Sequence, residues 1–189
     1  YSNTCRFILS CNYSSKIIEP IQSRCAVFRF KPLTDEAIRK RIEYIASREG
    51  IEITNGAIDA IVYIARGDMR RAINALQSAA VFGKRIEPDD VYQITASPHP
   101  EAIRELIDLS LKGEFIKARI KLNSLIDEGI SEEDILFGIH REVFNLDIPD
   151  RMKVALIDRI GEIDFRLTEG ANGRIQLEAL IAYLVLGSE

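Results

Sequence analysis

Cysteine and histidine are scarce in this chain of 189 residues. Its three cysteines, Cys5, Cys11 and Cys25, form no C-x-x-C pair, and its two histidines, His99 and His140, lie far from them in sequence. An odd number of cysteines without paired spacing argues against a disulfide framework and against a zinc site. We therefore expect no bound metal and an intracellular location, in the cytoplasm or in the nucleus of a eukaryotic cell.

Long apolar runs and a positive overall charge are also absent. No uninterrupted apolar run reaches the roughly 18 residues that a membrane span requires, and the first residues lack the pattern of a secretory leader. The 25 Lys and Arg residues are outnumbered by 29 Asp and Glu residues, which gives a formal net charge of −4. We expect a soluble protein with no membrane partner, in which any contact with nucleic acid is made by local basic groups.

Two short apolar segments near the start of the chain predict strands. Residues 6–11 read RFILSC and residues 26–30 read AVFRF, and both resemble strands that are covered on two faces. Two short strands cannot form a sheet that buries both sides. We interpret residues 1–31 as the end of a larger α/β domain, and we expect this segment to be poorly ordered or paired with another chain without the rest of its sheet.

From Pro32 onward, apolar residues recur with the 3.6-residue period of helices. Residues 32–96 are predicted to form a small helical bundle of antiparallel neighbours. Its expected helices have a cap at Thr34 and a stop at Gly50, a cap at Thr54 or Asn55 and an end near Gly67, and a cap at Asp68, followed by a short fourth helix over Pro88–Ile94.

The sequence SPHP at residues 97–100 predicts a linker, because two prolines within four residues disfavour a continuous helix. Five further helices are expected over residues 101–112, 114–128, 131–146, 150–167 and 173–186. In the last of them, the segment QLEALIAYLVL is apolar around nearly its whole circumference, so it must be covered on more than one side. The cover comes either from the same domain or from a subunit interface.

The segment GDMRRAIN at residues 67–74 is a candidate phosphate site. With Asp68 as the cap, Arg70 and Arg71 lie in the first turn of a helix, where the helix dipole disfavours a cation by roughly 0.3 to 1 kcal/mol. Free N–H groups and an arginine at a helix start are suited to a phosphate. The alternative is that both guanidiniums point into solvent and that Asp68 offsets their charge.

Asn12 and Arg24 are candidates near the predicted strands. Asn12 follows the first strand, at the end where open α/β sheets bind ligands, although Asn is more often found in turns. Arg24 precedes the second strand and either pairs with Glu19 or acts as an arginine finger on a transferred phosphoryl group. The chain has no G-x-x-x-x-G-K-[ST] motif and no strand that ends in paired acids for Mg²⁺, so we expect it neither to bind nor to hydrolyse ATP alone.

The segments SCNYSSKIIEPIQSRCAVFRFKPL and GDMRRAIN, followed by five helices, together resemble the small subunits of replication factor C, an AAA+ sliding-clamp loader. The resemblance implies that Asn12 is sensor 1, that Arg24 is an arginine finger for the ATP site of the neighbouring subunit, and that Arg70 is sensor 2 for the subunit's own ATP. It assigns Arg71 no role.

The same resemblance implies the domains, partners and cofactor. Residues 1–31 would be the C-terminal remnant of an AAA+ ATPase domain, residues 32–96 a helical lid and residues 101–189 a collar that binds other clamp-loader subunits. The complete complex would use ATP with Mg²⁺ to load the sliding clamp onto primer–template DNA. Because the Walker A and Walker B motifs are absent, we expect this chain to be a C-terminal part of such a subunit.

Two other interpretations are open at this stage. The chain could be a non-catalytic helical adaptor that joins other proteins through Leu177, Leu180 and Leu184. It could also belong to a related AAA+ loader subunit. Under either interpretation, the fold is mainly α-helical.

Overall fold

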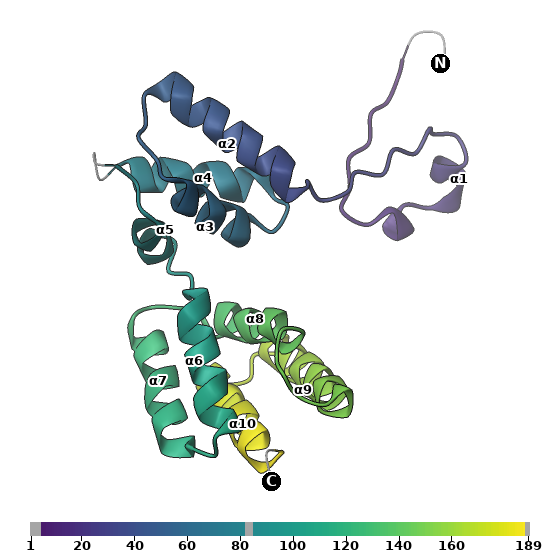
Figure 1. Cartoon of the computed structure of the whole chain (residues 1–189). Coiled ribbons are helices and arrows are strands. Elements are labelled where there is room, and N and C mark those ends of the chain that lie inside the picture. Colours follow the sequence, from purple (N-terminus) through teal and green to yellow (C-terminus); the bar gives the residue numbers. More distant parts are fainter. Residues whose placement is uncertain (1–4, 82–84, 188–189) are drawn as a thin grey trace. The chain divides into compact units, whose positions relative to one another are not determined.

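The computed structural model describes residues 5–81 and 85–187. The chain divides into two compact units, Tyr1–Pro32 and Leu33–Glu189. In the first unit, a 3-10 helix, η1 (Ser14–Lys16), precedes the short helix α1 (Glu19–Gln22), which has Pro20 in its first turn (Figure 1). Neither short helix is predicted by the sequence pattern.

The two strands predicted in the first unit are not confirmed. Residues 6–11 and 26–30 form no strand in the described part of the chain, and Ile8 and Phe30 are 97% and 95% exposed. A strand requires a hydrogen-bonded neighbour, and neither segment finds one among the described residues. No residue from 5 to 32 is buried, so the first unit lacks the covered face that its apolar pattern calls for.

The second unit begins with four helices: α2 (Asp35–Glu49), α3 (Asn55–Ala65), α4 (Met69–Ala80) and α5 (Pro88–Ile94). We call them the N-terminal bundle (Figure 1). The capping predictions are confirmed, because the side chains of Thr34, Thr54 and Asp68 accept hydrogen bonds from backbone N–H groups in the first turns of α2, α3 and α4. Gly50 ends α2 with a φ of 67°.

A separate apolar core holds the N-terminal bundle together. A parallel β-bridge between Ile53 and Ile86 closes the loop before α3 onto the segment before α5. It supplies a hydrogen bond from Thr54 N–H to the Ile86 carbonyl, with a length of 3.1 Å. The largest fully buried side chains of this core are Ile38, Ile42, Ile61, Leu76 and Ile86.

Five helices follow: α6 (Pro100–Leu111), α7 (Phe115–Asp127), α8 (Glu132–Val143), α9 (Asp150–Thr168) and α10 (Gly173–Leu186). We call them the C-terminal bundle. Their bounds lie within three residues of the predicted ones. His99 caps α6, since its Nδ1 accepts a hydrogen bond from the N–H of Glu101. The largest fully buried side chains of this bundle are Ile103, Leu106, Ile107, Leu122, Ile135, Leu156 and Ile163.

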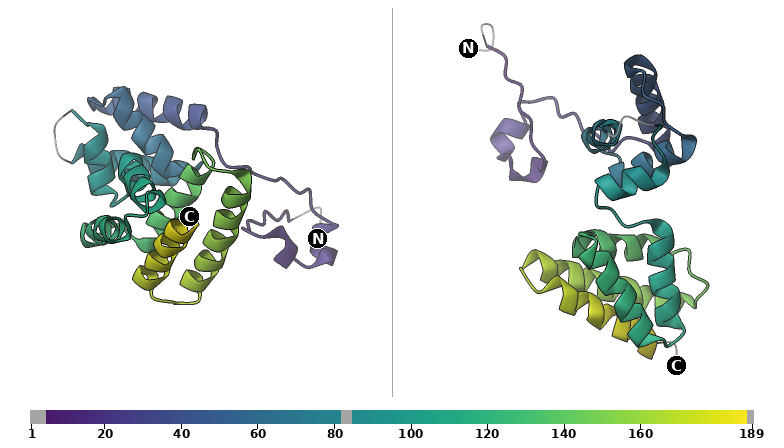
Figure 2. Two further views of the ribbon diagram at one scale, coloured as in Figure 1. Left: turned by 60° about the horizontal axis from the view of Figure 1, so that its bottom comes forward. Right: turned by 90° about the vertical axis from the view of Figure 1, so that its left-hand side faces the viewer.

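Helix α10 is covered by its own bundle, which answers the question raised by its apolar circumference. It packs against α6, α7, α8 and α9 (Figure 2), and Leu177, Leu180 and Leu184 are each at most 2% exposed. These three leucines therefore belong to the core. The suggestion that they form an adaptor surface is wrong, because a partner could reach them only by unfolding the bundle.

Two helical glycines offer a matched test of the packing in the C-terminal bundle. A Cβ added to Gly138 in α8 would lie 3.0 Å from Cγ1 of the fully buried Ile103, whereas one added to Gly161 in α9 would meet nothing within 4 Å. We predict that Gly161→Ala raises the free energy of unfolding by roughly 0.5 to 1 kcal/mol. Gly138→Ala should lower it, because α6 and α8 must separate. Equal stabilisation of both variants in urea unfolding would contradict this packing.

The cap of α4 gives a second prediction. Asp68→Ala should lower the free energy of unfolding by about 1 kcal/mol, because two N–H groups lose their acceptor. Asp68→Asn retains an acceptor oxygen, so it should lower the free energy of unfolding by only a few tenths of the loss expected for Asp68→Ala. Urea unfolding of both variants measures the difference, and an Asn variant as unstable as the Ala variant would show that the cap does not stabilise α4.

Candidate phosphate-binding cleft at the start of helix α4

The start of α4 is organised by Asp68. Its Oδ1 accepts hydrogen bonds from the N–H groups of Arg70 at 2.8 Å and Arg71 at 3.2 Å. These N–H groups are therefore not free for an anion, contrary to the expectation from the sequence. Any attraction of a phosphate to this place must come from side chains, principally the guanidiniums of Arg70 and Arg71.

A surface cleft of about 400 Å³ lies beside this helix start. Its polar lining comes from one face of α4, because Arg70, Asn74 and Ser78 follow one another at the helical spacing of four. Ile94 and Thr95, at the end of α5, also line the cleft. The cleft is lined by Ile64, Asp68, Arg70, Arg71, Asn74, Ala75, Ser78, Ile94 and Thr95.

The two arginines in this cleft differ in their partners. Within residues 5–81 and 85–187, the Arg70 side chain makes no ion pair and no hydrogen bond, and the residue is exposed. Arg71 is half-buried, and its Nη2 lies 3.6 Å from Oδ1 of Asp134, in the first turn of α8. The structure thus leaves one guanidinium available in the cleft and directs its neighbour toward the C-terminal bundle.

Asp134 belongs to a polar junction between the two bundles. Arg66, just after α3, donates from Nη2 to Oδ1 of Asp134 at 2.9 Å, and its guanidinium lies 3.5 Å from the centre of the Phe137 ring. Arg66 has a φ of 51°, in the left-handed region that non-glycine residues seldom occupy. Arg66 is the C-terminal cap of α3, a position at which many helices end on a left-handed residue.

A second arginine crosses the junction in the opposite direction. Arg141 of α8 donates to the backbone carbonyl of Tyr63 at 3.0 Å, and its guanidinium lies 3.7 Å from the centre of the Tyr63 ring. Tyr63 contacts Tyr92 edge-on, and Tyr92 lies against His99 with ring centres 4.5 Å apart. Both tyrosines of the N-terminal bundle therefore contact residues at or in helices of the C-terminal bundle.

Burial dominates the electrostatics of the junction. It raises the pKa of Tyr63, and it raises the pKa of Tyr92 to about 12. It also lowers the pKa of the Arg66 guanidinium, and the positive charge of Arg71 acts in the same direction, while Asp134 opposes both. The junction therefore holds more positive charge than its one shared carboxylate balances.

The other two predicted site residues, Asn12 and Arg24, lie in the first unit. Nη1 of Arg24 donates to the Pro20 carbonyl at 2.7 Å, and no carboxylate of the described residues pairs with it, so the suggested pairing with Glu19 is wrong. Asn12 is exposed, and it does not follow a strand here. No contact joins Asn12 to Arg24, and Arg70 belongs to the other unit.

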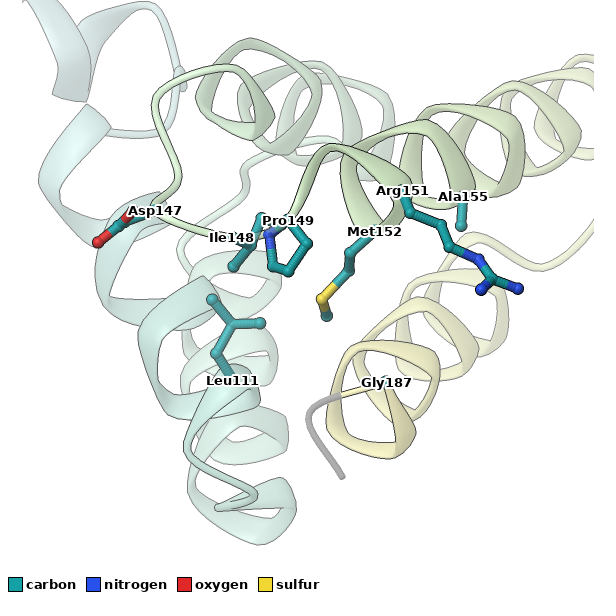
Figure 3. Close-up of a pocket in the computed structure, with 8 residues that line it drawn as sticks. All are labelled: Leu111, Asp147, Ile148, Pro149, Arg151, Met152, Ala155 and Gly187. Carbon is teal, nitrogen blue, oxygen red and sulfur yellow. The ribbon is translucent and has the colours of Figure 1, made fainter.

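A larger cleft, of about 690 Å³, lies in the C-terminal bundle but contains no predicted site residue. Figure 3 shows the side chain of Met152 pointing into it, between Leu111 of α6 and the end of α10 at Gly187. Most of its lining is apolar, and no ion pair joins its two charged residues, Asp147 and Arg151. Nothing in it suggests chemistry on a charged substrate.

Neither a metal cluster nor a membrane span is found in the described ranges. No group of three or more His, Cys, Asp or Glu side chains there could hold a metal ion. No helix among those residues is long and apolar enough to cross a membrane.

Comparison with known proteins identifies the family. Residues 98–183 match the family described as "Replication factor C C-terminal domain", and residues 35–93 match "RFC1-like, AAA+ ATPase lid domain". The Bacillus subtilis DNA clamp loader delta protein is similar in structure with a TM-score of 0.49 and 15% identity, over 93% of this chain and 63% of that one. A likeness of that size supports no inference.

Three archaeal relatives, each named "Replication factor C small subunit", are much closer. That of Archaeoglobus fulgidus is 57% identical over 97% of this chain and 58% of its own length. That of Methanosarcina acetivorans is 53% identical over 100% of this chain and 59% of its own length, and that of Thermococcus kodakarensis is 57% identical over 98% and 22%. The chain spans only part of each relative. It belongs to the replication factor C family.

Proposed function

We propose that this chain is part of a clamp-loader subunit that uses ATP, inside the cell, to place a sliding clamp on primer–template DNA. In this proposal residues 1–31 are part of an AAA+ ATPase domain, residues 32–96 are its lid and residues 101–189 are a collar. One observation carries the proposal. Arg70 lines a cleft beside a helix start without any carboxylate partner in the described residues, while Arg71 is held by Asp134.

Arg70 is the residue that we assign to the subunit's own nucleotide, as sensor 2. A phosphate of ATP in the cleft would accept hydrogen bonds from its guanidinium, with Asn74 and Ser78 as further polar groups in the same wall. An arginine that already has a carboxylate partner would have to give it up first. Arg70 has none among the described residues, so it can respond to the phosphate at little cost.

Arg24 is assigned to the neighbouring subunit's ATP as the arginine finger, and Asn12 to sensor 1. Arg24 is exposed, and the one hydrogen bond that its guanidinium makes in the described part of the chain is to a backbone carbonyl. A neutral carbonyl leaves the positive charge unbalanced, so the guanidinium can stabilise negative charge that develops during phosphoryl transfer. ATP supplies the phosphoryl group, and we assign no ligand of its Mg²⁺ to this chain.

The collar is proposed to bind other clamp-loader subunits through surfaces that its core leaves exposed. Ile116 and Ile120 lie one turn apart on α7 and are 65% and 64% exposed, and Ile175 on the adjacent helix α10 is 62% exposed. Large exposed apolar side chains on neighbouring helices are typical of protein interfaces. These isoleucines replace the buried leucines of α10 as the expected contact surface.

The two arginines can be separated by kinetics in the complete subunit assembled with its partners. Arg24→Ala should lower the turnover number for ATP at the sites that this subunit completes by roughly a thousandfold or more, with little effect on ATP affinity or assembly. Arg70→Ala should weaken ATP binding roughly tenfold to a hundredfold, because a charge-assisted hydrogen bond is lost.

Arg48→Ala provides a control, because this arginine lies on α2, stacks on the ring of Tyr44 and makes no ion pair with any of the described residues. Pre-steady-state ATP hydrolysis and equilibrium nucleotide binding are the measurements. Normal turnover and clamp loading by the Arg24→Ala complex would remove the finger assignment. Normal ATP affinity in the Arg70→Ala complex would remove the sensor assignment.

A further inference from the structure

Asp134 is shared between two arginines of the N-terminal bundle. Its Oδ1 contacts Nη2 of Arg66 at 2.9 Å and Nη2 of Arg71 at 3.6 Å. Its Oδ2 accepts a hydrogen bond from the Ser131 hydroxyl at 3.0 Å, and its own N–H donates to the same Ser131 oxygen. The carboxylate is therefore fixed by the start of α8, while two guanidiniums compete for one of its oxygens.

The two contacts are not equivalent. Arg66 has the shorter contact and is also stacked on Phe137, so two separate contacts fix the position of its guanidinium. Among the described residues, the Arg71 guanidinium has only the longer contact to Asp134, and the Arg66 guanidinium repels it. Because one negative charge cannot balance two positive charges, Arg71 is the guanidinium that a further anion can recruit.

Arg71 also lines the cleft that contains Arg70. Its side chain is thus placed between two possible anions, the Asp134 carboxylate on α8 and a ligand in the cleft. A polyphosphate in the cleft would attract Arg71 and repel Asp134. Either effect weakens the contact between α4 and α8.

We propose that Asp134 is a positioning residue of the C-terminal bundle that competes with a polyphosphate in the cleft for the Arg71 guanidinium, and so couples phosphate binding to the contact between the two bundles. This inference rests on the proposed function, because it requires the cleft to take phosphate. Coupling is reciprocal. Asp134 lowers the affinity of the cleft for phosphate, and phosphate loosens the hold of Asp134 on α4.

A double-mutant cycle on the complete subunit tests the inference, with inorganic tripolyphosphate as the probe and NMR signals of the arginine Nε–H groups as the readout. Asp134→Asn should tighten tripolyphosphate binding about fivefold, because Arg71 is released. In an Arg71→Gln background the same substitution should change the affinity less than twofold. A merely structural role for Asp134 would instead weaken binding in both backgrounds.

Two further variants complete the design. Glu133→Gln removes the same charge from the neighbouring exposed position, which has no ion pair in the described residues, and should change the affinity less than twofold. Arg66→Gln leaves Asp134 to Arg71 alone, so it should weaken tripolyphosphate binding, and the weakening should disappear in the Arg71→Gln background. If Asp134→Asn does not fold, Arg66→Gln still tests the proposal, because it predicts weaker rather than tighter tripolyphosphate binding.

The outcomes separate this inference from the proposed function. If Arg70→Ala abolishes binding but Asp134→Asn and Glu133→Gln have equal effects, the coupling is wrong and the phosphate cleft stands. If tripolyphosphate shifts the signals of neither Arg70 nor Arg71 in the unmodified complete subunit, both proposals are overturned. Tighter binding that depends on Arg71 supports both.

Discussion

The carboxylate of Asp134 joins the two helical bundles through two arginines at once. It lies in the first turn of α8, where a negative charge is favoured by the helix dipole, and it contacts arginines at the end of α3 and the start of α4. The Arg141 contact with Tyr63 crosses the same junction in the opposite direction. Most of these contacts involve a charged side chain. A charged ligand can therefore weaken the junction, whereas it would have little effect on the two apolar cores.

This arrangement divides the roles of two adjacent arginines. Arg71 is used by the protein itself, to join the bundles, whereas Arg70 has no partner in the described residues and lines the cleft. Asp68 satisfies the backbone N–H groups of both. The helix start therefore does not bind an anion through its backbone. The proposed phosphate contact depends on side chains. It is therefore sensitive to whether Asp134 holds the Arg71 guanidinium or releases it to the cleft.

Much of the helical fold could be predicted from the sequence, because its signals are local. The caps at Thr34, Thr54 and Asp68 are set by residues within three positions of each helix start. Apart from the two short local helices η1 and α1, the missed features depend on partners far away in sequence. The strands predicted near Ile8 and Phe28 require neighbours that the described residues do not supply. No local pattern places Asp134 beside Arg71, and at the end of α3 an arginine rather than the usual glycine takes the left-handed conformation.

We propose that Arg24 and Arg70, which lie in separate units and have no carboxylate partner among the described residues, contact nucleotide phosphates in the assembled complex. The most direct test is the structure of an assembled ring of complete subunits with bound nucleotide. The account predicts the Arg70 guanidinium within hydrogen-bonding distance of a phosphate of its own subunit, and that of Arg24 at a phosphate of the adjacent subunit. Either side chain directed into solvent, or paired with a carboxylate of its own chain, would contradict the account.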